Sequence, residues 1–153
     1  VADDRGVVKV QYYDGERFVC EAGPPTFSCP YRITGADVGR NTLIAVAIDG
    51  ADQRATATRV VTVQRFAPKL SLAVKARGHK VTASGTLSDA GSCSGRVRIS
   101  GGGVTTRAKV RSNCTYRATL RLARTGKVRV SARFEGNRST AAKSAKSRTA
   151  RLG

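Results

Sequence analysis

The sequence predicts an all-β protein of two small domains, and three observations lead to this expectation. Short runs of alternating apolar and polar residues recur along the chain, and a period of two is typical of strands that are buried on one face. Aromatic residues make up only 5% of the sequence, which has no Met and no Trp, and this composition favours small β domains. Residues 1–67 carry eight basic and eight acidic residues, whereas residues 68–153 carry twenty basic and two acidic residues.

The second half contains seven alternating runs, each expected to form a strand. They span 69–76, 79–87, 95–100, 104–111, 116–122, 127–134 and 141–150. Gly or Ser clusters lie between them, and seven short strands in about 85 residues is typical of an immunoglobulin-like sandwich. The apolar residues of two of these runs are expected to face inward, namely Leu120, Leu122, Val128, Val130, Ala132 and Phe134. The arginines between them are then expected to face outward.

The first half is similar but has fewer runs. Five strands are expected, at 7–13, 16–20, 27–33, 42–48 and 55–63, and residues 42–48 are apolar enough for a central strand covered on both faces. Pro68 and the change in charge place a domain boundary near Phe66. The expected fold is therefore two tandem immunoglobulin-like β-sandwich domains, residues 1–66 and 68–153.

The four cysteines form one pair in each half, Cys20 with Cys29 and Cys93 with Cys114. A zinc site needs closer cysteine spacing or companion histidines, and His79 is the single histidine of the sequence. No CxxC redox motif is present. We expect two disulfides, with a metal site or free thiols as the alternatives, and disulfides imply an oxidising, exported location.

The spacing of the first pair predicts the register of a hairpin. Directly opposed residues of an antiparallel hairpin have a constant sum of residue numbers, so a bond between Cys20 and Cys29 centres the turn on Pro24-Pro25, where turn residues belong. The same register places Phe18 opposite Tyr31, a favourable aromatic pair.

The second pair, treated in the same way, centres a hairpin turn on Gly103-Val104 and gathers basic residues on one face. Apolar residues are opposed on the inner face, and like charges on the outer face: Val97 with Val110, Ile99 with Ala108, Arg96 with Arg111, and Arg98 with Lys109. The strand at 127–134 is expected beside the strand at 95–100. The candidate anion-binding residues are therefore Arg96, Arg98, Arg107, Lys109, Arg111, Lys127, Arg129 and Arg133. The alternative interpretation is a solvated surface without a ligand.

The residues also resemble a family, the tandem bacterial Ig-like (Big-type) repeats of secreted and cell-surface proteins. Its D-x-x-G-V-x-x-V strand, DG turn and G-x-N-T-L-x-A-x-A-x-D strand are similar to Asp4 to Val10, Asp14-Gly15 and Gly39 to Asp49. The "VRVSARFEGN" stretch at 128–137 resembles the end of another repeat. These motifs form turns and core strands, so the resemblance implies a fold and no catalytic residues.

The resemblance also implies that the first domain lacks one or more N-terminal strands. Strand-forming sequence precedes the D-x-x-G-V motif in the family, and only Val1 to Asp3 precede it here. The absent strands are expected either to lie outside this sequence or to come from another chain by strand addition. A bare sheet edge would otherwise favour self-association.

No arrangement of residues predicts an enzyme, a cofactor or a metal. His79 has no Ser or Cys partner at a recognisable spacing, and the Gly101 to Gly103 run lacks the lysine of a phosphate-binding loop. A calcium site at Asp3, Asp4, Asp49 and Asp52 is a weak alternative, because no calcium-loop pattern accompanies these residues.

The expected function is that of a non-catalytic structural or adhesive module of a bacterial extracellular or cell-surface protein, with a surface protein or polysaccharide as partner. One alternative is a module that binds a polyanion, such as a cell-wall polymer or acidic polysaccharide, and another is a fibre subunit assembled by strand complementation. No run approaches the roughly 18 apolar residues of a membrane span. Nucleic acid is disfavoured because the only aromatic residues after residue 68, Tyr116 and Phe134, are expected to face inward.

Overall fold

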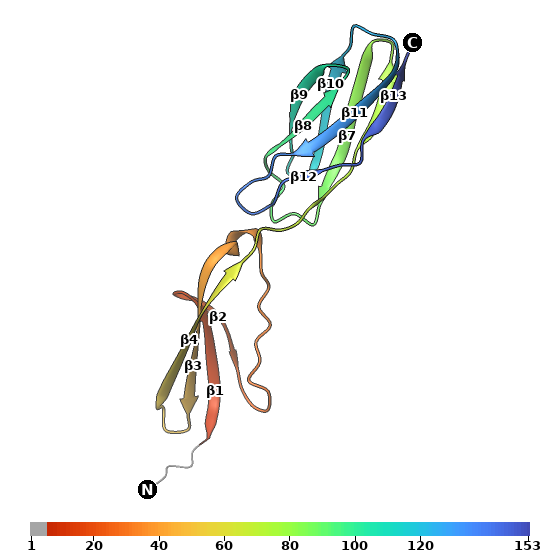
Figure 1. The fold of residues 1–153 in the computed structure, drawn as a ribbon. Helices are drawn as coiled ribbons and strands as arrows, with labels where there is room; N and C mark the ends of the chain where they lie inside the picture. The colour runs from red at the N-terminus through yellow and green to blue at the C-terminus, as the bar shows by residue number, and fades with distance from the viewer. Residues whose placement is uncertain (1–5) are drawn as a thin grey trace. The chain divides into compact units, whose positions relative to one another are not determined.

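The computed structural model describes residues 6–153, which form two compact β units (Figure 1). Unit 1 ends at Gln64, and unit 2 begins at Arg65. Apart from one 3₁₀ turn, η1 (Gly35–Asp37), the regular elements of the described residues are strands. The predicted all-β class is therefore confirmed. No helix in residues 6–153 has the length and hydropathy to cross a bilayer.

Unit 2 is an immunoglobulin-like sandwich of two antiparallel sheets. In the first sheet β10 (Thr115–Arg121) pairs with β7 (Lys80–Ser88), whose other edge pairs with β5 (Lys69–Leu70) and β6 (Ala73–Arg77). The second sheet has the order β12-β11-β8-β9, and β13 also pairs with β11. The bounds of these strands are β8 (Arg96–Gly101), β9 (Val104–Lys109), β11 (Gly126–Phe134), β12 (Lys143–Ser144) and β13 (Arg148–Leu152).

Strict alternation builds the core of unit 2. Along β11 every second residue is buried, and the residues between them are exposed. Val81 of β7, Ile99 of β8 and Phe134 of β11 are each fully buried between the two sheets. The prediction that the apolar residues of 120–122 and 128–134 face inward is confirmed, since all six are buried. Each fully buried Val, Leu, Ile or Phe side chain stabilises the sandwich by roughly 1.5–3 kcal/mol.

A buried tyrosine fastens the first sheet of unit 2 to the segment between β5 and β6. The hydroxyl of Tyr116, on β10, donates to the carbonyl of Ser71, which satisfies a polar group in an otherwise apolar core. Burial raises the pKa of Tyr116 to about 12. Gly85 lies directly opposite Tyr116 in the register of β7 and β10, and its lack of a side chain leaves room for this contact.

Unit 1 has one sheet in place of two. Its four strands have the order β2-β1-β3-β4, and their bounds are β1 (Val7–Asp14), β2 (Arg17–Ala22), β3 (Gly39–Asp49) and β4 (Arg54–Val63). The predicted strand at 27–33 is wrong, because this segment forms a coil that pairs with no strand among residues 6–153. The run at 42–48 is central, between β1 and β4, but six of its seven residues are only half-buried.

The sheet of unit 1 repeats the topology of one sheet of unit 2. The order β2-β1-β3-β4 corresponds to β9-β8-β11-β13, with each strand at the same place along the chain. In unit 2 the chain between β9 and β11 forms β10 of the covering sheet, and in unit 1 the coil 23–38 occupies that place. Residues 6–64 contain no equivalent of β5, β6 and β7. Unit 1 is thus one layer of a sandwich, and the coil 27–33 has no neighbour to make it a strand.

Both predicted disulfides are present, but the first does not close the predicted hairpin. Cys20 lies on β2 opposite Tyr12 of β1, and Cys29 lies on the coil. The predicted opposition of Phe18 and Tyr31 is therefore wrong. Phe18 is opposite Tyr13, and their rings meet edge to face with centroids 5.6 Å apart. The bond Cys20–Cys29 ties the coil to the sheet, with 6.3 Å between the Cα atoms.

The predicted register of the second hairpin is wrong by two residues. Arg96 is opposite Lys109 in place of Arg111, and Arg98 is opposite Arg107 in place of Lys109. The predicted apolar pairs move with them, so that Val97 faces Ala108 and Ile99 faces Thr106. Cys93 and Cys114 lie outside the ladder, before β8 and after β9, so their spacing does not set its register. A shift of two residues keeps every side chain on its predicted face.

We expect Gly85→Ala to destabilise unit 2. A Cβ atom at this position would overlap the Ser71 carbonyl oxygen and lie 2.8 Å from the Tyr116 hydroxyl oxygen. The carbonyl belongs to the backbone and cannot rotate away, so the free energy of unfolding should fall by about 1–3 kcal/mol. Urea denaturation measures the change. Ser84→Ala, at the adjacent position of the same strand, serves as the control, and equal stability of the two variants would contradict the expectation.

Candidate anion-binding site

The outward face of the β12/β13-β11-β8-β9 sheet, which we call the cationic face, carries arginines that are directly opposed across three strands. Arg98 of β8 is flanked by Arg107 of β9 and by Arg133 of β11 in a single cross-strand row. All three side chains are exposed. Neighbouring strands are about 4.8 Å apart, so this row places three positive charges in a short line across the sheet.

The other predicted residues fall on or beside this face. Arg96 and Lys109 form the next row, while Lys127 and Arg129 follow along β11. Arg111 is an exception, since it lies beyond the end of β9 in the turn that leads to β10. Arg107 is partly neutralised, because its Nε donates to Glu135 at 2.9 Å.

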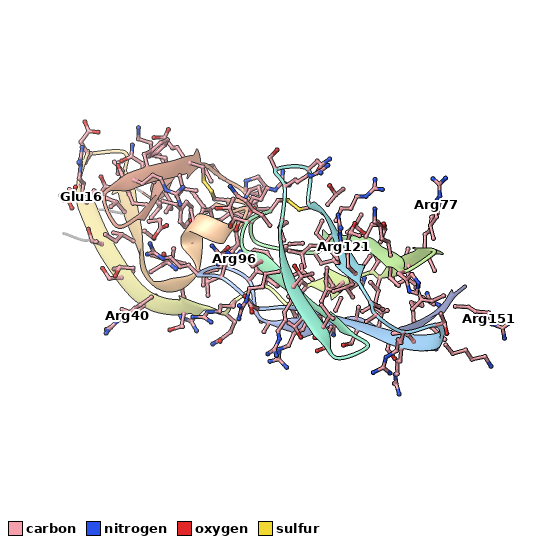
Figure 2. The ribbon with its side chains drawn as sticks, turned by 90° about the horizontal axis from the view of Figure 1, so that it is seen from above. Glu16, Arg40, Arg77, Arg96, Arg121 and Arg151 are labelled. Atoms are coloured by element: carbon pink, nitrogen blue, oxygen red, sulfur yellow. A yellow bond between two sulfur atoms is a disulfide. The ribbon has the colours of Figure 1, made fainter. Side chains whose placement is uncertain are left out.

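Sequence reasoning missed basic residues elsewhere on unit 2. Arg151 of β13 lies opposite Lys127 and extends the cationic face. The opposite sheet also has outward cations, namely Lys75, Arg77, Lys80, Arg117 and Arg121. Figure 2 shows Arg77 and Arg151 projecting away from the strands. The same alternation that identified the first face could have identified the second, since these residues occupy the polar positions of their runs.

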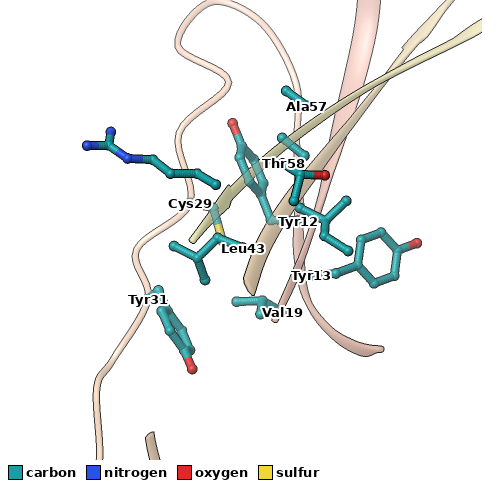
Figure 3. A pocket seen from close by; sticks show the side chains of 11 residues that line it. Tyr12, Tyr13, Val19, Cys29, Tyr31, Leu43, Ala57 and Thr58 are labelled. Atoms are coloured by element: carbon teal, nitrogen blue, oxygen red, sulfur yellow. The ribbon is translucent and has the colours of Figure 1, made fainter. Parts of the chain in front are cut away.

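Unit 1 contains an apolar pocket of about 270 Å³ between its sheet and the coil. In Figure 3 Cys29 and Tyr31 extend from the coil, opposite Tyr12 and Leu43 of the strands. The Tyr12 hydroxyl donates to the carbonyl of Phe27, which is a second attachment of the coil beside the disulfide. The pocket occupies the space where a sandwich has its core.

A polar network holds the far end of the coil and was not identified from the sequence. Asp37 accepts hydrogen bonds from the backbone N–H and the hydroxyl of Thr34, at 2.6 and 2.7 Å, and from the hydroxyl of Tyr31 at 2.9 Å. Arg17 forms ion pairs with Asp37 at 3.0 Å and with Asp14 at 2.9 Å. Tyr31, Thr34 and Asp37 lie three residues apart in the sequence, and this spacing is the one sequence signal that could have suggested the network.

The network shifts two pKa values in opposite directions. The hydrogen bonds from Thr34, aided by Tyr31 and Arg17, lower the pKa of Asp37 to about 2. Burial, followed by the bonds to Asp14 and Asp37, raises the pKa of Tyr31 to about 12. Tyr31 and Asp37 keep their ordinary charge at neutral pH, so the bonds by which the network attaches the coil to the sheet persist there.

The remaining sequence candidates are dispersed. His79 is exposed in the turn between β6 and β7. Within residues 6–153 no three His, Cys, Asp or Glu side chains gather as metal ligands. Of the weak calcium candidates, Asp49 caps the β3–β4 turn by accepting from the N–H groups of Ala51 and Gln53, at 2.8 Å each. Asp3 and Asp4 lie outside the described residues.

The chain matches no protein-family model and no curated protein. It is similar in structure to fibronectin(III)-like modules of CbhA from Clostridium thermocellum, with 20% identity and a TM-score of 0.42 over 99% of this chain and 81% of that one. It is also similar to SGBP-B of the Bacteroides ovatus mixed-linkage glucan utilization locus, solved with a heptasaccharide. There the identity is 13% and the TM-score 0.33, over 98% of this chain and 38% of that one.

We expect Asp37→Asn to destabilise unit 1 in a pH-dependent way. The folded pKa of Asp37 lies below its ordinary value of 3.8, so the stabilisation is fully present above about pH 4 and is lost as the pH falls through 2. At pH 6 the variant should lose on the order of 2 kcal/mol, and the difference from the unchanged chain should shrink toward pH 2.

Denaturation followed by the near-UV signal of tyrosine tests this expectation, since three of the four tyrosines lie in unit 1. Asp52→Asn removes an exposed carboxylate of the same unit and controls for the lost charge. A stability difference of the same size at pH 6 and pH 2 would refute the role of the ionised carboxylate.

Proposed function

We propose that this chain is a non-catalytic β-sandwich module of a bacterial extracellular or cell-surface protein, and that its unit 2 adheres to a polyanion through the cationic face. The row Arg107–Arg98–Arg133 is the observation that carries the proposal. Directly opposed like charges cost roughly 0.2–1 kcal/mol each, and a bound anion would offset this repulsion. A cell-wall polymer or an acidic polysaccharide is the ligand class with repeated negative charges that such a surface meets outside the cell.

The charge distribution of unit 2 supports the same conclusion. Residues 68–153 contain two carboxylates, Asp89 and Glu135, and these pair with Lys69 and Arg107. The other cations of the cationic face therefore have no carboxylate of residues 68–153 to neutralise them. A dense and uncompensated field of this kind raises the local concentration of anions and speeds their association.

Both disulfides favour an extracellular location. Such bonds persist in oxidising environments and are rare in the cytosol, and unit 1 depends on one of them to hold its coil against the sheet. Nucleic acid fits less well as the ligand, because two of the three aromatic residues of unit 2, Tyr116 and Phe134, are fully buried and the third, Phe66, is half-buried. No exposed ring of unit 2 is therefore available for stacking with bases.

We expect neutralisation of the cationic face to weaken polyanion binding more than the same charge change elsewhere. Arg96, Arg98, Arg129 and Arg133 are changed together to Gln, and retention on a heparin column is measured along a salt gradient. The variant should elute at a clearly lower salt concentration, because each lost contact reduces the release of counterions.

The opposite sheet provides a matched control. Changing Arg77, Lys80, Arg117 and Arg121 to Gln removes the same four charges from the other face of unit 2. Equal loss of retention in the two variants would show that binding follows net charge alone, and this result would overturn a dedicated face.

A second candidate function is self-association through unit 1, and the apolar face of its sheet, which the coil covers only in part, favours it. Tyr12, Cys20, Ala45 and Ala57 form one cross-strand row on the side that carries the coil. Ala57 at the end of this row is exposed. A second copy of this chain, whose own sheet bears the same apolar row, could supply the missing layer and continue into a fibre by strand exchange.

We expect Ala57→Glu to shift this association toward the monomer. The change places a charge on the apolar face, whereas Thr58→Glu places the same charge one residue along β4, where alternation turns the side chain to the other face. Sedimentation equilibrium over a range of protein concentrations measures the oligomer fraction. Purely monomeric behaviour of the unchanged chain, or equal shifts by both variants, would exclude this candidate.

A further inference from the structure

The cationic face has a hollow beside the break between β12 and β13. Two adjoining depressions, of about 720 and 250 Å³, have Ser100, Ser131 and Ala145 in common. Ser100 of β8 lies directly opposite Ser131 of β11. These two serines form one cross-strand row, and the next row on the same face is the pair Arg98 and Arg133. We call the depression above the two serines the serine hollow.

Cations line the serine hollow on two sides. Arg98 and Arg133, which are opposed across β8 and β11, line the smaller depression. Arg129 and Lys146 line the larger one. Residues two apart on a strand are about 7 Å apart, so Arg129 and Arg133 stand on either side of Ser131 at that spacing. The hollow therefore combines a hydroxyl floor with positive charge on opposite rims.

One of the rim cations is held in position. The Nε of Arg129 donates to the Oγ of Ser147 at 2.8 Å, and Ser147 belongs to the segment between β12 and β13. This bond leaves the two terminal nitrogens of the Arg129 guanidinium to donate to a ligand. Less side-chain freedom is then lost when an anion binds, because the guanidinium is already oriented.

The arrangement of donors selects among anions by shape. A carboxylate is planar, and one guanidinium can satisfy it with two parallel N–H donors. A sulfate or phosphate ester is tetrahedral and presents two or three unesterified oxygens in different directions, so it gains most from donors that converge from several sides. The serine hollow offers guanidinium donors from Arg98 and Arg133 on one rim, and hydroxyl donors from below. The other rim offers the guanidinium of Arg129 and the ammonium of Lys146.

We propose that the serine hollow is a binding site for one tetrahedral oxyanion ester, a sulfate or phosphate group carried on a saccharide or polyol chain. This proposal rests on the proposed function and adds the chemical group that is recognised. The wider cationic face then holds the rest of the polymer through charge, while the hollow receives a single ester group at a fixed place on the sheet.

The test uses the full chain and three short ligands of similar charge, with binding measured by isothermal titration calorimetry at physiological ionic strength. They are a heparin-derived tetrasaccharide with sulfate esters, a glycerol phosphate oligomer with phosphodiesters, and an oligogalacturonate with carboxylates alone. At least one of the two esters should bind tenfold or more tightly than the oligogalacturonate. The tighter ester identifies the source of the group, and oligogalacturonate binding as tightly as both esters would overturn the proposal.

Two sets of variants locate the site without changing the net charge. Ser131→Tyr fills the hollow and should weaken ester binding at least tenfold, whereas Thr119→Tyr makes the same change at an outward position of β10 and should have no effect. The double variant Ser100→Ala with Ser131→Ala removes only the floor hydroxyls and should weaken binding about threefold or more. It gives a result even if the larger side chain disturbs folding.

The outcomes separate this proposal from the proposed function. Unchanged ester binding in both serine variants would refute the hollow, and the dependence of heparin retention on the four arginines of the cationic face would be unaffected by that result. Loss of the arginine dependence would instead refute the function on which the hollow rests.

Discussion

The alternation of side chains along an extended strand is the constraint on which the rest of the structure depends. A buried residue forces its neighbours to face outward, so the apolar positions of β11 decide where Arg129 and Arg133 point. Pairing in register then brings such residues together across strands, which is how Arg98 comes to lie between two other arginines. The core and the cationic face of unit 2 are therefore two results of the same pattern.

A sheet with one apolar side needs a cover, and the two units meet this requirement differently. In unit 2 the sheet that carries β8 and β11 is covered by β7 and β10, which complete a closed core. In unit 1 the corresponding sheet has only the coil 23–38 above it, fastened by the Cys20–Cys29 bond and by the polar network around Asp37. The network takes over part of the attachment that backbone pairing supplies in unit 2.

Much of the fold follows from the sequence, because period-two patterns are local. Five of the seven predicted strands of unit 2 and the inward residues of β11 could be predicted in this way. The runs at 69–76 and 141–150, each expected as one strand, form two short strands apiece. The coil 27–33 could not, since its alternation is as good as that of a strand and only the absence of a pairing neighbour decides its state. The register of β8 and β9 could not be predicted from the spacing of the cysteines either. Cys114 lies in a turn with a φ of 61° and stands outside the ladder. The serine hollow depends on the break between β12 and β13, which no pattern in residues 141–150 reveals.

The bond between Cys93 and Cys114 has a mechanical consequence for a chain that is pulled from its two ends. It encloses β8 and β9 in a covalent loop with a sequence separation of 21 residues. Tension applied at the termini passes through the bond, so roughly 70 Å of extended chain is never released. The hairpin that bears Arg96, Arg98, Arg107 and Lys109 lies inside that loop. A load strong enough to peel away β5 or β13 therefore bypasses the backbone of this hairpin.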